Sequence, residues 1–375
     1  MPAILAMHMA NELLTPPVAA ATLVLAAVVV AAASLRAGNG KRLPADRAPL
    51  MGVMGAFVFA AQMINFSLPG MPGTSGHMVG GVLLAILLGP AAGIVTIAAI
   101  LIVQCLLFQD GGLLALGCNI INMGVVPCLV GWGVYRLLLG PAGAAKAGRQ
   151  YLAAWAACTA GVAGGAALVP AESYVSGVLR INVWQFLQVM VGMHVLIGFV
   201  EGAITFAVLA YLRRVRPAAV GLAGAEGPPG RVGGKGVVVS LLVTALLLAG
   251  VVSWFASTHP DGLEWAYQEH FKHGDKPAVE NASPVVAAVD RWQAKWSPMS
   301  DYARRSAPLG QEPPAAEAGA GAGSQKASAS AAWPNVSGWG SLAGVLGTLV
   351  TLAILYPVTK KFRRRVVAPG TAETS

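Results

Sequence analysis

Long apolar runs alternate with short polar or basic stretches along most of this chain. A helix needs roughly 20 mostly apolar residues to span a bilayer, and nine runs reach or approach that length. They are residues 18–35, 50–66, 77–90, 92–108, 114–139, 151–170, 184–211, 236–256 and 338–358. The third run is short and contains glycine, so we expect it to tilt or to begin within the membrane, while the fifth and seventh are long enough to tilt or break. The pattern predicts an all-α integral membrane protein.

The composition agrees with residence in a membrane. The chain has 375 residues, of which 56% are hydrophobic and 11% charged, and its mean hydropathy is +0.65; soluble domains average about a quarter charged residues. Met1 to Pro17 carry no basic residue and the apolar runs recur, so the start is not interpreted as a cleaved secretory signal. The four cysteines lie singly in apolar runs, which favours buried small hydrophobic side chains over metal ligands or disulfides.

The basic residues gather in alternate loops, and this distribution predicts an orientation. The formal net charge is +9, but it is spread between the apolar runs, which argues against a nucleic-acid partner. With the N-terminus outside, the inward positions are Arg36, Lys41, Arg42, Arg47, Arg136, Lys146, Arg149, Arg213, Arg214, Arg216, Arg231, Lys235, Lys360, Lys361, Arg363, Arg364 and Arg365. The short outside segments hold only Arg180. The positive-inside rule therefore predicts a multi-pass protein of the cell inner (plasma) membrane, surrounded by lipid, with the N-terminus outside and the C-terminus cytoplasmic.

A stretch rich in proline and glycine, residues 213–235, is predicted to be a flexible cytoplasmic linker between two domains. The first domain is predicted over residues 7–212. The second, residues 236–358, has two apolar runs that flank an outer segment from Ser257 to Ser337. Residues 359–375 are predicted to form a basic cytoplasmic tail.

The outer segment has a mixed character. Ala315 to Ala332 is low in complexity and is expected to be disordered. Residues 261–272 and 283–296 are expected to form short amphipathic helices. Three tryptophans would anchor them at the membrane interface, namely Trp265, Trp292 and Trp296. Three histidines of this segment are either solvated or contact an entering metal, namely His259, His270 and His273.

Two other histidines are the main candidates for a metal site. His77 follows a Gly-Thr-Ser-Gly stretch, residues 73–76, whose Thr74 or Ser75 could cap a helix. His8 lies before the first apolar run. The predicted topology places both on the outer face. On local grounds two alternatives stay open, namely a capping loop whose histidine faces water and a terminal histidine without a role.

A specific ligand set arises if translation starts at Met7. The free amine, the amide nitrogen of His8 and its imidazole could then chelate one metal in fused rings, with a fourth nitrogen from His77. Four nitrogens in a plane suit Ni²⁺, because tetragonal geometry is a preference of Ni²⁺ and Cu²⁺, and they disfavour Mg²⁺ and Ca²⁺, which prefer oxygen. If Met1 is the first residue, its amine is too far along the chain to form this chelate.

Several neutral or acidic residues could support these histidines. Metal-bound imidazole usually needs a partner on its other ring nitrogen. The candidates are Ser75, Gln104, Asp110, Asn119 and Asn122. Turn formation and helix contacts are the alternative roles for the same side chains.

His194 and Glu201 are a further pair, seven residues apart on one helical face. Ionisable groups at membrane depth are functional candidates, and the alternative is a polar pair that locks helices together. The chain has no P-loop, no His-Glu-x-x-His and no Gly-x-Ser-x-Gly motif. Energy for pumping would therefore come from another chain or from an ion gradient.

Several motifs taken together resemble a known family. The stretches concerned are Met7 to Pro17, Gly73 to His77, Phe108 to Leu113, Leu116 to Asn119 and Asn122 to Gly124. They resemble the substrate-binding membrane component of energy-coupling factor (ECF) cobalt/nickel transporters, the CbiM/NikM family, over residues 7–212. His259 to Glu264 contain the Pro-Asp-Gly-Leu-Glu signature of a small accessory domain, similar in role to the CbiN/NikN subunit, over residues 236–358.

The resemblance implies a fold, a site and partners. The fold is a bundle of about seven helices, the ECF S-component bundle, plus a two-helix accessory domain with an outer loop. The metal ligands would be Met7, His8 and His77. Two departures from the family pattern are Ala10-Asn11-Glu12 in place of Pro-Asp-Gly and six extra residues before Met7. We expect the mature amine to belong to Met7.

The sequence therefore predicts the metal-binding subunit of an ECF importer, which is not itself an enzyme. Its implied partners are a transmembrane coupling (T) subunit and cytoplasmic ATPase (A) subunits. Ni²⁺ or Co²⁺ would be the transported substrate, with no permanently bound cofactor, and the planar ligand set favours nickel. The alternatives are a membrane metal sensor or storage protein, or a metal-dependent intramembrane hydrolase that uses His194 and Glu201.

Overall fold

The computed structural model describes residues 8–38, 48–140, 147–215, 234–271, 277–302 and 334–362. Met7 lies outside the described residues. So do His273, the stretch 315–332, most of the predicted linker 213–235 and the tail beyond Phe362.

The described elements are almost all helices. In chain order the first part contains η1 (Asn11–Leu13), α1 (Pro16–Gly38), α2 (Ala48–Gln62), β1 (Phe66–Ser67), β2 (Ser75–Gly76), α3 (Gly81–Leu88), α4 (Pro90–Val103), η2 (Gln104–Phe108), α5 (Leu116–Asn119), η3 (Ile120–Val125), η4 (Pro127–Gly131), α6 (Trp132–Leu139), α7 (Ala147–Ala166), α8 (Leu168–Val175) and α9 (Val183–Val215). The second part contains α10 (Gly234–Gly250), η6 (Val252–Phe255), α11 (Gly262–Glu264), η7 (Trp265–His270), α12 (Pro284–Trp296), η8 (Ser300–Tyr302) and α13 (Gly338–Phe362).

The predicted all-α membrane fold is confirmed. Six helices in the described part are long and apolar enough to span a bilayer, namely Pro16–Gly38, Pro90–Phe108, Leu116–Leu139, Gly148–Val175, Val183–Val215 and Gly338–Phe362. Two shorter apolar helices are Leu50–Gln62 and Gly236–Gly250. The short third run forms α3, whose 8 residues span only about 12 Å at 1.5 Å per residue.

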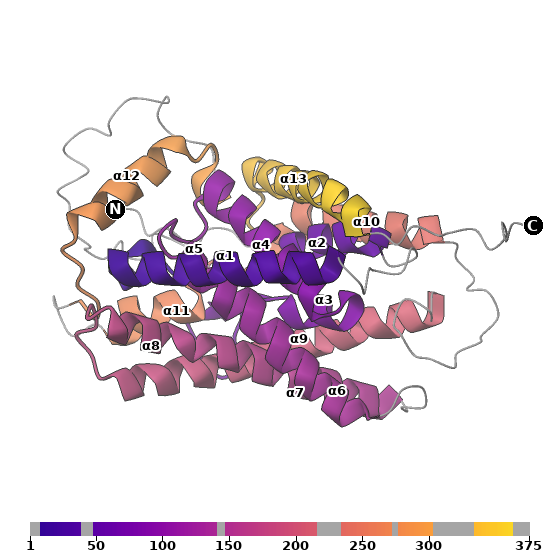
Figure 1. Cartoon of the computed structure of the whole chain (residues 1–375), viewed down its shortest axis with the longest axis horizontal. Helices are drawn as coiled ribbons and strands as arrows, with labels where there is room; N and C mark the ends of the chain where they lie inside the picture. The colour runs from indigo at the N-terminus through magenta and orange to yellow at the C-terminus, as the bar shows by residue number, and fades with distance from the viewer. Residues whose placement is uncertain are drawn as a thin grey trace, which may run out of the picture.

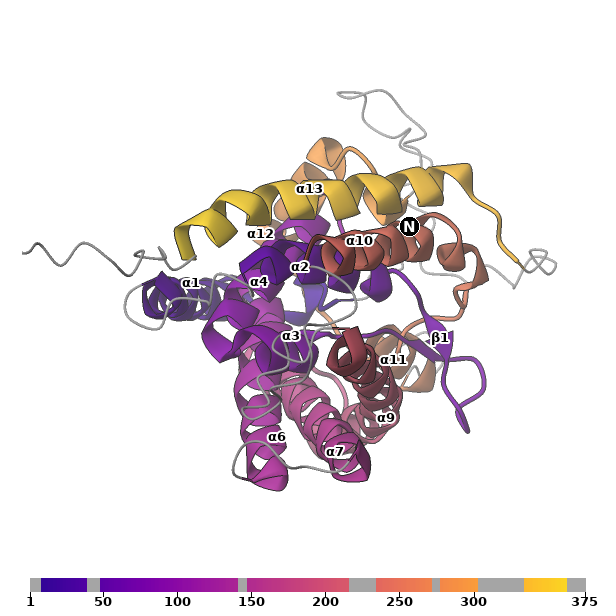
Figure 2. The same ribbon diagram turned by 90° about the vertical axis from the view of Figure 1, so that its right-hand side faces the viewer.

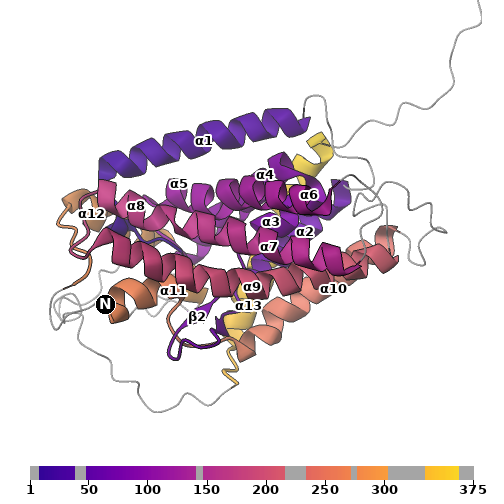
Figure 3. The same cartoon turned by 90° about the horizontal axis from the view of Figure 1, so that it is seen from below.

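The long helices run side by side along one axis, so the bundle has two opposite ends (Figure 1). Seen end-on, α10 and α13 cover one side of α2, whereas α6, α7 and α9 form the opposite side (Figure 2). The helix α1 lies along one edge (Figure 3) and exposes apolar side chains such as Val24 and Val28. The contact of α7 with α9 depends on small residues, because a Cβ at Gly198 would lie 2.6 Å from Thr159 Cα.

The accessory segment lies at one end of this bundle. The expected amphipathic helices 261–272 and 283–296 appear as α11 with η7 and as α12, both at the left end in Figure 1. Trp292 and Trp296 are 50% and 57% exposed, as expected for interface anchors. Trp265 instead stacks on His270 with ring centroids 4.8 Å apart. The four cysteines are buried and free, as expected.

Candidate metal site

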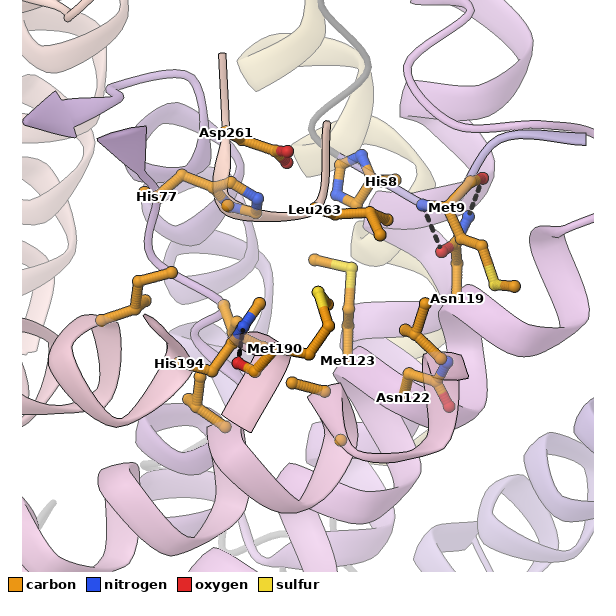
Figure 4. A pocket seen from close by; sticks show the side chains of 18 residues that line it. His8, Met9, His77, Asn119, Asn122, Met123, Met190, His194, Asp261 and Leu263 are labelled. Atoms are coloured by element: carbon orange, nitrogen blue, oxygen red, sulfur yellow. Dashed lines mark hydrogen bonds between the residues drawn. The ribbon is translucent and has the colours of Figure 1, made fainter. Parts of the chain in front are cut away.

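His8 and His77 meet at the wall of one buried cavity. Their ring centroids are 5.5 Å apart with an interplanar angle of 60°, and the residues are 3% and 8% exposed. The cavity has a volume of about 60 Å³. Its lining also includes Asn119, Asn122, Met123, Met190, His194 and Asp261 (Figure 4). The two imidazoles therefore line the same cavity.

The backbone beside His8 is held by the loop and helix that follow η2. Asn119 Oδ1 accepts a hydrogen bond from Met9 N at 3.0 Å, and Asn119 Nδ2 donates to Met9 O at 3.2 Å. Gly112 N donates to the same carbonyl at 3.0 Å. Gly111 has φ +89°, and a Cβ there would lie 2.9 Å from His8 Cβ. Glycine is thus required at 111 by both conformation and space.

One ring nitrogen of His8 contacts a carboxylate, and the other has no hydrogen-bond partner among the described residues. His8 Nδ1 lies 2.6 Å from Asp110 Oδ1. Burial raises the pKa of Asp110, but attraction to His8 and hydrogen bonds from His8 and Tyr302 bring it below its ordinary value. An ionised carboxylate only accepts, so Nδ1 carries the proton. Within the described residues His8 Nε2 has no hydrogen-bond partner.

This orientation bears on the fused chelate predicted for Met7 and His8. Ring closure onto the amide nitrogen of a histidine runs through Nδ1, because Nε2 lies on the far side of the ring. Since Asp110 engages Nδ1 in the structure, the chelate requires the His8 ring to turn about its Cβ–Cγ bond. Met7 lies outside the described residues, and the amine ligand stays a prediction.

His77 lies in a strap that is fixed on both sides. Before it, β2 pairs antiparallel with β1. After it, the carboxylate of Glu201 accepts hydrogen bonds from Val79 N at 2.7 Å and from Gly80 N at 3.1 Å. These donors precede α3 and belong to the groups that a helix N-terminus leaves unpaired. A carboxylate there is also favoured by the helix dipole. Glu201 therefore ties α9 to the strap that holds His77.

Ser75 does not cap α3, because that helix begins at Gly81 and its N-cap makes no side-chain hydrogen bond. Ser75 Oγ lies 2.8 Å from His259 O and 3.1 Å from Pro260 O, and it donates toward these two carbonyls. The serine thus joins the His77 strap to the accessory segment.

Three other residues that were predicted as candidates for the site form hydrogen bonds with neighbouring parts of the fold. Gln104 Nε2 donates to Gln62 Oε1 at 2.9 Å. Asn122 lines the cavity and donates to Glu172 Oε2 at 2.8 Å. His194 also lines the cavity, and its Nδ1 donates at 2.7 Å to a carbonyl four residues earlier in α9.

Asp261 was not among the predicted site residues, and it lines the cavity beside the histidines. Its carboxylate points toward His8 and His77 (Figure 4). Its Oδ1 accepts a hydrogen bond from Glu264 N at 2.8 Å as the N-cap of α11, and burial raises its pKa. The Asp-x-x-Glu capping pattern was a visible signal for the helix. Over the described part of the chain, no three His, Cys, Asp or Glu side chains are arranged to hold a metal as they stand.

Two family descriptions match this chain. The description "Cobalt uptake substrate-specific transmembrane region", CbiM, matches residues 8–219. The PDGLE domain matches residues 235–364. Together the two matches cover both parts of the fold.

Individual relatives agree with these matches. The chain is 30% identical over 336 residues to the fused nickel transport protein NikMN of Rhodobacter capsulatus, and the match covers 81% of this chain and 91% of that protein. It is 33% identical over 218 residues to the cobalt transport protein CbiM of Geobacter sulfurreducens, covering 54% of this chain and 60% of that one. A solved transition metal transporter is 26% identical with a TM-score of 0.48, covering 59% of this chain and 100% of the other.

Proposed function

Because this chain belongs to the CbiM family of cobalt uptake transmembrane regions and has a PDGLE domain behind that region, we propose that it is the substrate-binding membrane subunit of an ECF importer for Ni²⁺ or Co²⁺. The observation that carries the proposal is the pair His8 and His77, which line one buried cavity with ring centroids 5.5 Å apart. Imidazole suits both metals. A buried histidine pair beside the carboxylate of Asp261 is a site for a divalent cation.

The ligands predicted for the cation are the amine of Met7, the amide nitrogen and imidazole of His8, and the imidazole of His77. This chelate uses His8 Nδ1, so on binding the His8 ring would turn away from Asp110. Asp261 adds negative charge from the accessory domain. The ion is the cargo of the transporter.

The two ends of the bundle support the predicted orientation. The accessory helices α11 and α12 lie at one end of the bundle (Figures 1 and 3), and Asp261, Gly262 and Leu263 at the start of α11 line the cavity. Basic residues end the helices that run toward the other end, including Arg36 in α1, Arg213 in α9 and Lys360 in α13. By the positive-inside rule the basic end is cytoplasmic. The cavity then lies toward the outer side of the cytoplasmic membrane, from which the ion arrives.

Energy for uptake would come from partner chains. The sequence has no nucleotide-binding loop, so ATP hydrolysis belongs to ATPase subunits that act through a transmembrane coupling subunit. The hydrolase alternative is less favoured, because the oxygens of Glu201 accept backbone hydrogen bonds from Val79 and Gly80 and the residue is not among those that line the cavity.

Uptake of radioactive nickel and cobalt by cells tests the proposal. Cells that express the chain with its coupling subunit and ATPases should accumulate metal, and cells without the coupling subunit should not. His77→Ala should abolish uptake, whereas His270→Ala, in the accessory segment, should leave it intact. Binding without uptake in the complete system would instead indicate a sensor or storage protein.

A further inference from the structure

We propose that Asn11 is a positioning residue for the metal site, because it latches the N-terminal segment that carries His8 to helix α12 of the accessory domain. The latch is the set of contacts that Asn11 makes with Asp290 and Gln293. This inference rests on the proposed function, because it concerns how the same site is held in place for its cation. It also gives a physical reason for one departure from the family pattern, the asparagine at position 11 in place of aspartate.

The side-chain amide of Asn11 uses both of its ends. Its Oδ1 accepts a hydrogen bond from Leu114 N at 2.7 Å. Its Nδ2 donates to Asp290 Oδ1 at 2.5 Å and to Gln293 Oε1 at 3.3 Å. A backbone N–H can only donate and an ionised carboxylate can only accept, so the amide fits in one orientation. An aspartate at position 11 could accept from Leu114 N, but it would have no proton to donate to α12.

Gln293 joins α12 to the loop that follows η2. The residue is 2% exposed. Its Oε1 accepts from Leu113 N at 3.0 Å, and its Nε2 donates to Gly111 O at 2.9 Å and to Cys105 O at 3.1 Å. Because these partners are backbone groups on both ends of the amide, the loop is fixed against α12 as firmly as the N-terminal segment is.

The same loop contacts the residues beside His8. Gly112 N donates to Met9 O at 3.0 Å, one residue after His8. A Cβ at Gly112 would collide with Asn11 Oδ1, so the loop and the N-terminal segment lie in direct contact. The position of His8 therefore depends on the loop and on the latch together.

A second accessory residue holds the N-terminal segment just before α1. Asn281 Nδ2 donates to Glu12 O at 3.1 Å and to Leu14 O at 2.8 Å. These hydrogen bonds and those of Asn11 engage the chain after His8 and not its imidazole. The ring of His8 stays free to turn, so the latch is compatible with a chelate that uses Nδ1.

Equilibrium binding of Ni²⁺ to the purified full chain in detergent tests the inference. Asn11→Asp sets a second carboxylate against that of Asp290, which repels it and receives no hydrogen bond from it. If the latched form falls to about a tenth of the population, the apparent dissociation constant rises about tenfold. Planar Ni²⁺ is diamagnetic, so the diamagnetic fraction of the bound nickel, which reports the four-nitrogen chelate, should fall as well.

Asn182→Asp is the matched control for the added charge. Asn182 is exposed before α9, where its Oδ1 accepts from Trp184 N at 2.9 Å. Aspartate serves as well as asparagine at a helix N-cap. This variant adds the same negative charge without touching the latch, so it should bind nickel as the wild type does.

A reciprocal exchange separates the latch from general packing. Asp290→Asn alone should bind nickel nearly as the wild type does, because its side-chain oxygen can still accept from Asn11. Added to Asn11→Asp, the same substitution supplies the donor that the pair has lost. The double variant should therefore recover most of the affinity and of the diamagnetic fraction.

Normal nickel binding by Asn11→Asp, or a loss that Asp290→Asn does not restore, would overturn the inference while the proposed function stands. If the wild type binds neither nickel nor cobalt, or if His77→Ala binds both normally, the proposed function fails and the inference falls with it.

Discussion

Ser75 donates a backbone hydrogen bond to Pro260 across 2.9 Å, which joins the strap before His77 to the accessory domain. The next accessory residue, Asp261, forms a parallel β-bridge with the same serine. The accessory domain is therefore part of the wall around the histidine pair.

The carboxylate of Asp261 should contribute to cation affinity. Asp261→Asn keeps an N-cap residue but removes the negative charge that faces His8 and His77, so we expect nickel affinity to fall on the order of tenfold. Calorimetric titration of the purified chain measures the change. Glu280→Gln removes the same charge from an exposed ion pair with Arg180, and it should have no effect. Equal losses in the two variants would show that only net charge matters.

Glu201 should be needed for the shape of the His77 strap. In Glu201→Gln one oxygen is replaced by an amide group that cannot accept from Val79 N or Gly80 N, so one buried donor loses its partner at a cost of about 1–3 kcal/mol. Thermal unfolding should report this loss together with weaker metal binding. Glu172→Gln is the control, because a glutamine oxygen can still accept from Asn122. A wild-type melting temperature in Glu201→Gln would contradict the assigned role.

Glycine at 111 should be required by the position of His8. Gly70 and Gly111 both have positive φ, at +80° and +89°, so an alanine at either costs about 1–2 kcal/mol in backbone strain. An added Cβ meets nothing within 4 Å at Gly70, but it lies 2.9 Å from His8 Cβ at Gly111. We therefore expect Gly111→Ala to lose metal binding and Gly70→Ala to keep it, as measured by titration. Equal binding by the two variants would show that His8 can shift freely.

The magnetic state of bound nickel should reveal which nitrogen of His8 binds. The fused chelate predicted at Met7 gives a planar set of four nitrogens, and planar Ni²⁺ is diamagnetic. Binding through Nε2, with Nδ1 kept by Asp110, does not impose that plane. We expect a diamagnetic nickel complex, in which the His8 ring has turned away from Asp110, measured by the solution magnetic susceptibility of the loaded chain. A paramagnetic complex would mean that His8 binds through Nε2 and that the planar chelate does not form.

Much of the fold could be predicted because lipid imposes simple rules. Each described spanning helix coincides with an apolar run of sufficient length, and α11 and α12 coincide with amphipathic patterns in the outer segment. The sequence could predict that His8 and His77 lie on the same face, because alternate loops of a membrane protein lie on the same side. The position of Met7 is not described, and its role as a ligand stays a prediction.

The supporting contacts could not be predicted, because they join residues far apart in the chain. Tyr302 and Asp110 are separated by 192 positions, and η8 has only three residues, too few to show a periodic pattern. Glu201 was visible as an ionisable residue at membrane depth, but its partners are backbone amides, which any sequence supplies. Only the folded chain shows which donors a side chain meets.

His8 and His77 are proposed to hold a nickel or cobalt ion as cargo. Equilibrium binding of Ni²⁺ to the purified full chain, to His77→Ala and to His194→Ala measures whether they do. We expect His77→Ala to weaken binding by more than about 100-fold, beyond the cost of losing a supporting partner, while His194→Ala stays near the wild type. If His77→Ala binds nickel normally, His77 is not a ligand and the proposed site is wrong.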